Sequence, residues 1–135
     1  MIDRSTPAGS KASAMLADAA VAWLTTVRSD GQPQASPVWF VVDDDDFLIY
    51  SMPTQRVRNI GTHPKVAVNL ESNDGSDVVS VEGTARIVNG PSSLDHEAYM
   101  TKYRSMIERM GSTPEEFASA YSIPIRVTPT RWRVY

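Results

Sequence analysis

The sequence predicts a single α+β domain over residues 1–135, built on an antiparallel β-barrel of six or seven strands with peripheral helices. Three observations favour this class. Short apolar and β-branched runs recur along the chain, turn signals such as Asp30-Gly31 separate them, and helical patterns are confined to the ends and to insertions. A length of 135 residues and a hydrophobic content of 41% are sufficient for one modest core.

The expected elements of the first half are a helix at Ser10–Ala20 and strands at Trp23–Val27, Gln34–Val42 and Phe47–Ser51. The helix has an apolar stripe at helical spacing and would be capped by Ser10 or Ser13, after a flexible start over residues 1–9. Pro37 lies inside the second strand and marks an edge, a bulge or a bend, because proline cannot donate to the sheet ladder. The acids Asp43–Asp46 lack calcium-loop spacing and are expected to form a solvated hairpin tip.

The expected elements of the second half are strands at Lys65–Glu71, Val78–Val88, Ile123–Arg126 and Thr130–Tyr135, and helices at Pro91–Met110 and from Thr113 to about Tyr121. One face of the long strand would consist of Val79, Val81, Gly83, Ala85 and Ile87. Such an apolar face fits the wall of a barrel. Gly111 ends the long helix, and Thr113-Pro114-Glu115-Glu116 is a strong start signal for the next. Pro129 is expected to interrupt the final strand.

The stretch Ser51–Pro64, between two apolar strands, has the features of an anion site. Thr54 is the expected N-cap of a short helix. Residues 47–70 contain no carboxylate but three cations, Arg56, Arg58 and Lys65. Free N–H groups at a helix start and a guanidinium can act on the same phosphate. The alternative is that Arg56 and Arg58 are solvated surface charges. They do not share a helix face, so both reach one anion only at the helix mouth.

A second notable stretch is Pro37-Val38-Trp39-Phe40, a bent strand whose backbone could offer hydrogen-bonding groups to the edge of a planar ring. The alternative is that Trp39 and Phe40 point to opposite faces and that at least one of them belongs to the core.

The sequence predicts neither catalytic residues nor a metal site. No general base or nucleophile stands out, and nucleophile-elbow, Walker and Rossmann motifs are absent. The two histidines, His63 and His96, lack metal-ligand spacing. If this chain is an enzyme, a cofactor is expected to perform the difficult step.

Composition narrows the setting and the partners. The chain has no cysteine, which excludes disulfides and fits a cytoplasmic protein. It has no run of 18 apolar residues and no signal-peptide pattern, so no membrane partner is expected. A net charge of −3 argues against nonspecific binding of nucleic acid, whereas one local basic patch suits a small phosphorylated ligand.

The order of these motifs resembles the FMN-binding, Greek-key-like split barrel of the pyridoxamine 5′-phosphate oxidase superfamily. The resemblance is carried by Trp23–Val27, Asp30-Gly31, Pro37-Val38-Trp39-Phe40, Thr54-x-Arg56-x-Arg58-Asn59-Ile60 and His63-Pro64-x-Val66-Ala67. The tail is similar to a mainly actinobacterial, F420-dependent subgroup, through Lys102-Tyr103, Thr113–Phe117 and Tyr121–Arg131.

The resemblance implies a homodimer with two cofactor clefts at the subunit interface. It also implies coenzyme F420, with FMN as the alternative. By position, the cofactor phosphate would be held by Thr54, Arg56, Arg58 and Asn59. The tricyclic ring would be lined by the backbone around Pro37, Val38 and Trp39 and around Ser51 and Met52. The last strand, around Arg131-Trp132, would contribute from the partner chain.

The activity implied is that of an F420-dependent reductase, which transfers hydride between the deazaflavin and a small electrophilic substrate. The alternatives are an FMN-binding oxidoreductase and a non-catalytic protein that stores the cofactor. Vitamin B6 oxidation is not expected. The oxidases carry Ser-Arg-Lys where this chain has Thr54-Gln55-Arg56, and Arg131–Tyr135 lacks their C-terminal histidine. An F420 site should add a groove with further cations, for which the candidates are Lys65, Arg86 and Arg126.

Overall fold

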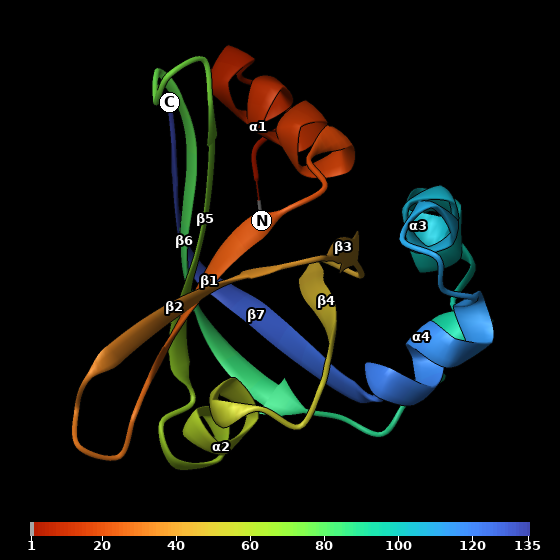
Figure 1. Cartoon of the computed structure of the whole chain (residues 1–135). Coiled ribbons are helices and arrows are strands. Elements are labelled where there is room, and N and C mark those ends of the chain that lie inside the picture. Colours follow the sequence, from red (N-terminus) through yellow and green to blue (C-terminus); the bar gives the residue numbers. More distant parts are fainter. Residues whose placement is uncertain (1) are drawn as a thin grey trace.

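The computed structural model describes residues 2–135; Met1, part of the expected flexible start, lies outside them (Figure 1). In chain order the elements of the described chain are α1 (Pro7–Asp18), β1 (Ala22–Val27), β2 (Pro33–Val38), β3 (Val41–Asp43), β4 (Asp46–Ser51), α2 (Gln55–Thr62), β5 (Lys65–Ser72), β6 (Asp77–Ile87), a 3-10 turn (Ser93–Asp95), α3 (Glu97–Arg109), α4 (Pro114–Ala120) and β7 (Ile123–Val134). None of these helices is long and apolar enough to cross a membrane.

The seven strands form one antiparallel sheet in the order β2-β1-β5-β6-β7-β4-β3. Strands β2 and β3 lie at opposite edges, yet only Trp39 and Phe40 separate them in the sequence. So short a link forces the two edges together and curls the sheet into a split barrel. The α+β barrel prediction is therefore confirmed, but the single strand predicted over Gln34–Val42 is wrong.

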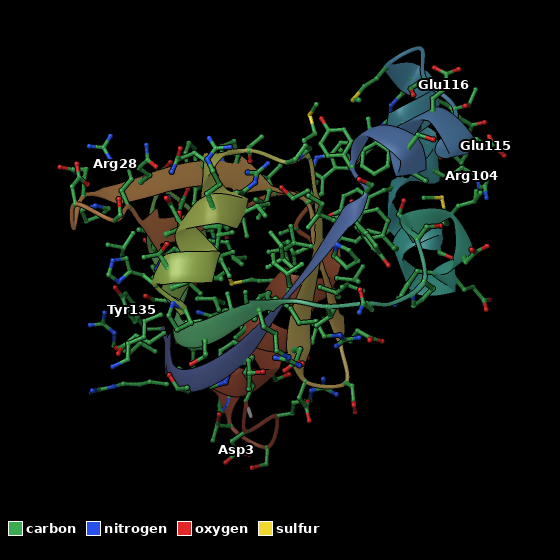
Figure 2. All side chains as sticks on the ribbon, turned by 90° about the horizontal axis from the view of Figure 1, so that it is seen from below. Asp3, Arg28, Arg104, Glu115, Glu116 and Tyr135 are labelled. Atoms are coloured by element: carbon green, nitrogen blue, oxygen red, sulfur yellow. The ribbon has the colours of Figure 1, made fainter. Side chains whose placement is uncertain are left out.

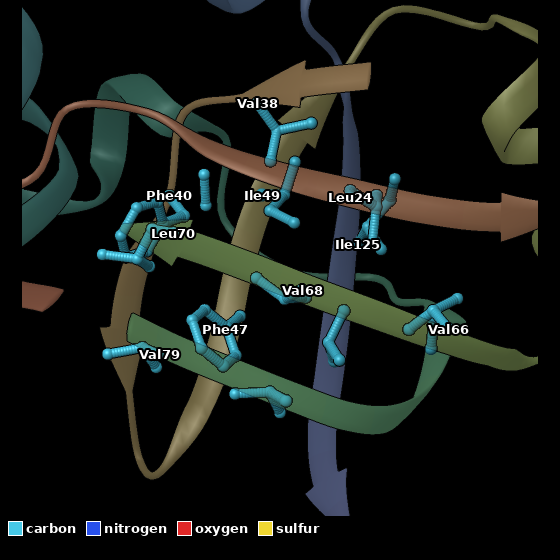
Figure 3. Close-up of a cluster of buried hydrophobic side chains, with 14 of the residues drawn as sticks. Leu24, Val38, Phe40, Phe47, Ile49, Val66, Val68, Leu70, Val79 and Ile125 are labelled. Carbon is cyan, nitrogen blue, oxygen red and sulfur yellow. The ribbon is translucent and has the colours of Figure 1, made fainter. Parts of the chain in front are cut away.

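The barrel interior is filled by side chains from all parts of the sheet. Figure 3 shows Leu24, Phe47 and Val68 pointing toward one another from different strands, each at most 1% exposed. Burying each such side chain contributes about 1.5–3 kcal/mol to stability. A second cluster lies under α3 and α4, and it contains Tyr50, Tyr99, Tyr103, Ile107 and Phe117. Arg104, Glu115 and Glu116 point away from it (Figure 2).

Two predicted helix starts are wrong by several residues. Helix α1 begins at Pro7 rather than Ser10, because Thr6 Oγ1 accepts a hydrogen bond from the Gly9 N–H at 3.0 Å and proline suits the first helical position. The long helix predicted from Pro91 begins at Glu97. His96 caps it through Nδ1, which accepts from the Tyr99 N–H at 3.2 Å.

The final strand is continuous through Pro129, so the predicted interruption is wrong. Glu82 pairs with Arg131 and Gly83 pairs with Pro129, which leaves Thr130 as the extra residue of a β-bulge. A bulge tolerates a residue without an N–H donor, and this explains why proline does not end the strand.

The acidic segment is a tight turn of which only the tip is solvated as predicted. Asp44 and Asp45 have positive φ values of 52° and 64° and are exposed, whereas Asp43 and Asp46 are partly buried. Arg126 forms ion pairs with Asp43 and with Asp46, and Arg86 pairs with Asp46 at 3.1 Å. These contacts join the β3–β4 hairpin to β6 and β7. They also occupy two of the three cations that the sequence had offered for an extended groove.

Candidate functional site

Two adjoining hollows lie beside β2. The first, here the α2 hollow, has a volume of about 280 Å³ and is lined by Thr26, Gln34, Ala35, Ser36, Thr54, Gln55 and Arg56. The second, the aromatic hollow, has a volume of about 210 Å³ and is lined by Pro37, Val38, Trp39, Tyr50, Arg56, Tyr99, Met110, Phe117 and Tyr121. Arg56 lines both, so the two hollows are neighbours, and together they are called the cleft below.

Arg56 is a half-buried cation without a carboxylate partner among residues 2–135. Its Nε donates to Ser51 Oγ at 3.0 Å, and its Nη1 donates to Ser36 Oγ at 2.9 Å. These hydroxyls fix the guanidinium but do not neutralise it. Burial lowers the pKa of Arg56, yet arginine stays charged at neutral pH. The cleft therefore contains a fixed, uncompensated positive charge.

Thr54 places unsatisfied polar groups at the same point. Its backbone has N-cap geometry, with φ −104° and ψ −177°, but its side chain makes no capping hydrogen bond. The Oγ1 atom is buried and has no partner in the described chain. The first-turn N–H groups of Gln55 and Arg56 have no intrahelical acceptor by helix geometry. The start of α2 thus offers several donors beside a guanidinium, which is the chemistry of a phosphate site.

Arg58 and Asn59, the other two residues assigned to the phosphate, lie elsewhere. Arg58 is exposed, and its Nε and Nη2 donate to Gln55 Oε1 at 3.2 and 2.8 Å. Asn59 is only 2% exposed, and its Nδ2 donates to Thr26 Oγ1 at 2.9 Å and to Gln34 Oε1 at 3.0 Å. Asn59 therefore fastens α2 to β1 and β2, and neither side chain lines the cleft.

The residues assigned to the ring divide in the same way. Pro37, Val38 and Trp39 line the aromatic hollow. Ser51 and Met52 line neither hollow. Ser51 is fully buried; its Oγ donates to the Met52 carbonyl at 2.7 Å and accepts from Arg56. Its contribution is to orient Arg56.

Of the aromatic wall of the cleft, only Trp39 was assigned to the site from the sequence. The Trp39 ring stacks on the Tyr103 ring, with the ring centroids 4.7 Å apart and an interplanar angle of 3°, and on the Phe117 ring, with the centroids 5.4 Å apart. Phe117 stacks in turn on Tyr121 at 4.4 Å. The Tyr99 hydroxyl is buried and has no partner within the described residues. Spacings of four residues within α3 and α4 were the available signal, but they indicate a core stripe equally well.

Helix α3 supplies the hydrogen bonds that the sheet loses at the Trp39–Phe40 break. Tyr103 Oη accepts from the Phe40 N–H at 2.8 Å and lies 2.7 Å from the Ala20 carbonyl. Lys102 Nζ donates to the Phe40 carbonyl at 2.9 Å and lies 4.0 Å from the Phe40 ring centroid. The break is therefore a fixed structural feature.

We expect the Lys102 ammonium to titrate near pH 8, because burial lowers its pKa from 10.5 to about 8. Between these pH values the unfolded chain binds more protons than the folded chain, so the contribution of Lys102 to stability rises with pH across this window. The measurement is a pH titration of the lysine CεH₂ signals by NMR, with Lys102→Met to assign them. A midpoint above pH 10 would contradict the expectation.

Neither histidine lines the cleft: His63 follows α2 and His96 caps α3. Among residues 2–135 there is no cluster of three side chains able to hold a metal ion.

A curled antiparallel sheet, with a phosphate-type helix start beside an aromatic wall, defines the chain as a flavin-binding-type split barrel. The family model described as pyridoxamine 5′-phosphate oxidase matches residues 9–135, and the chain belongs to this family.

Solved structures with the same fold differ in what their names say they do. A conserved hypothetical protein from Mycobacterium tuberculosis has a TM-score of 0.75 and 22% identity, over 93% of this chain and 82% of that one. An F420 reductase has a TM-score of 0.67 and 25% identity, over 89% of this chain and 94% of that one. The heme storage protein HutZ from Vibrio cholerae has a TM-score of 0.67 and 17% identity, over 96% of this chain and 95% of that one.

Proposed function

We propose that the protein is an F420-dependent oxidoreductase that transfers hydride between the deazaflavin and a small electrophilic substrate. The observation that carries the proposal is Arg56, a half-buried guanidinium without a carboxylate partner in the described chain, beside the unpaired Thr54 hydroxyl and an aromatic hollow. A buried charge of this kind is costly unless it binds an anion. A phosphorylated tricyclic cofactor supplies both the anion and a planar ring.

In this proposal the chain binds and orients the cofactor and contributes no acid or base. Arg56, Thr54 Oγ1 and the first turn of α2 would hold the phosphate, while Ser36 and Ser51 keep the guanidinium in place. The Pro37–Trp39 backbone would meet the ring. When bound, F420 supplies the hydride chemistry. Trp39, Phe117 and Tyr121 form an apolar wall that limits the access of water to the reacting face.

FMN remains the alternative cofactor, and non-catalytic storage the alternative role. Support for F420 comes from the resemblance of the tail and from the similarity to an F420 reductase. Of the three cations considered for an extended groove, Arg86 and Arg126 are paired with aspartates, and only Lys65 has no ion-pair partner within residues 2–135. Heme is not proposed as the ligand, because neither histidine lines the cleft to supply an imidazole ligand.

The deciding experiment is a parallel titration of the purified apo-protein with F420 and with FMN, followed by ligand fluorescence. Tight F420 binding with weak FMN binding supports the proposal, and turnover of electrophiles with reduced F420 then separates an enzyme from a storage protein. The reverse preference favours the FMN oxidoreductase. Binding of neither cofactor would refute the function while leaving the fold intact.

A second copy of the chain is proposed to cover the outer face of the sheet. Cross-strand pairing places Trp23, Pro37, Thr25 and Ala35 together on this face. Trp23 is 51% exposed. Pro37 and Ala35 also line the cleft, so a partner seated here would lie next to the cofactor.

We expect Trp23→Arg to yield a monomer, because it places a charge in an apolar contact. Light scattering at micromolar concentration measures the mass. Leu94→Arg, at an exposed site in the 3-10 turn, is the matched control and should leave the dimer intact. A wild-type protein that is already monomeric at this concentration would contradict the arrangement.

A further inference from the structure

A third cavity, of about 270 Å³, lies where α1, β3, α3 and β7 meet. Its walls include Arg4, Ser13, Leu16, Val41, Lys102 and Trp132. It shares no lining residue with the cleft formed by the α2 and aromatic hollows. A ligand here would therefore be distinct from the proposed cofactor.

The polar groups of this cavity are mainly donors. Lys102 Nζ donates to the Phe40 carbonyl and lies 3.4 Å from the Leu16 carbonyl. It forms no ion pair within residues 2–135, and Asp18 is the one carboxylate whose charge acts on its pKa. Arg4 forms no ion pair within residues 2–135. The indole N–H of Trp132 is buried and lacks an acceptor in the described chain. A buried donor without an acceptor is uncommon in native structures.

The charges lining the cavity do not cancel. Asp45 is its one lining carboxylate, against the two cations Arg4 and Lys102. Burial lowers the pKa of Lys102 only to about 8, so its ammonium is charged at pH 7. The remaining surface is largely apolar and includes Leu16, Val41 and Ala17. This combination suits a molecule with an anionic end and an apolar body.

We propose that this cavity binds a small carboxylate with an apolar or aromatic body. Lys102 and Arg4 attract the carboxylate, Ser13 offers a neutral donor, and the apolar walls, which include Trp132, cover the body. A cavity volume of 270 Å³ is just below the range typical of pockets that bind drug-sized ligands, so the expected ligand is a small acid. An amine of the same shape should bind more weakly, because the cavity is lined by two cations and one carboxylate.

The test compares 3-phenylpropanoate with phenethylamine, which have the same aromatic body and opposite charges. Isothermal titration calorimetry at pH 7 on the full chain measures binding, and quenching of tryptophan fluorescence gives a second readout. We expect saturable binding of the acid and weaker binding of the amine. Failure of the acid to bind, or equal binding of the amine, overturns the proposal.

Three variants locate the binding. Lys102→Met should weaken binding of the acid by about tenfold or more, the scale of a lost charge-assisted hydrogen bond. Ala17→Leu narrows the cavity from the side of α1, leaves Lys102 in the sequence, and should abolish binding of the acid. It keeps the test decisive if Lys102→Met folds poorly. Arg104→Met, an exposed cation of α3 outside the cavity, is the matched control. Binding that survives Ala17→Leu places the acid elsewhere and refutes the assignment. FMN and F420 titrations of Ala17→Leu should match those of the wild type, which separates this site from the cleft.

Discussion

Replacing Arg56 with methionine is expected to weaken binding of the preferred cofactor, F420 or FMN, by about 10- to 150-fold. This is the effect of losing about 1.5–3 kcal/mol, the scale for a hydrogen bond to a charged group. Arg56 lines both hollows of the cleft, and its guanidinium is held by Ser36 and Ser51 rather than by a carboxylate. Methionine preserves the apolar stem and removes the charge. Fluorescence titration of the folded variant measures the change.

Arg58→Met is the matched control for Arg56. It removes the same charge from the same helix, but Arg58 is exposed and its guanidinium contacts Gln55 rather than the cleft. We expect less than about a threefold change in affinity, since water and salt screen the interaction of an exposed charge with a ligand. Equal losses in both variants would indicate a general electrostatic attraction. An unchanged Arg56→Met affinity would remove Arg56 from the site.

Local patterns were sufficient to predict the class of the fold, and they also marked a candidate anion site. The Thr54–Ile60 segment combines a helix start with Arg56, and the structure places both beside the Pro37–Trp39 backbone. Alternation in β6 correctly predicted the buried positions Val79, Val81 and Ala85, because a strand has a period of two. Ile87, predicted on the same face, is 44% exposed because it lies at the strand end.

What the sequence could not show depends on contacts between distant segments. Asn59 was assigned to the phosphate, but it binds Thr26 and Gln34, partners 33 and 25 residues away. Trp39 was weighed as either core or ring contact. It lines the cleft while stacking on Tyr103 and Phe117, because α3 and α4 return to the β2 edge. No local pattern encodes such a return of the chain.

The substitution Gly83→Val is expected to lower the free energy of unfolding by about 3 kcal/mol, at the upper end of the range for overpacking. A Cβ atom at Gly83 would lie 2.7 Å from Val127 Cγ1 and 2.9 Å from the Thr128 carbonyl oxygen. The second contact is with backbone, which cannot move aside without disturbing the bulge at Thr130. Gly83 is therefore required by the close approach of β6 and β7, which allows the last strand to run on through Pro129.

Chemical denaturation followed by circular dichroism measures this effect. Gly61→Ala is the matched control, because a Cβ atom there would meet nothing within 4 Å and alanine favours the helical conformation of α2. It should leave stability unchanged or raise it by up to about 1 kcal/mol. If Gly83→Val were as stable as the wild type, β6 and β7 would not approach this closely. The pairing of β6 with β7, which joins the two halves of the barrel, would then differ from the one described. The position of β4 would change as well, because β4 pairs with β7 and its Tyr50 lines the aromatic hollow.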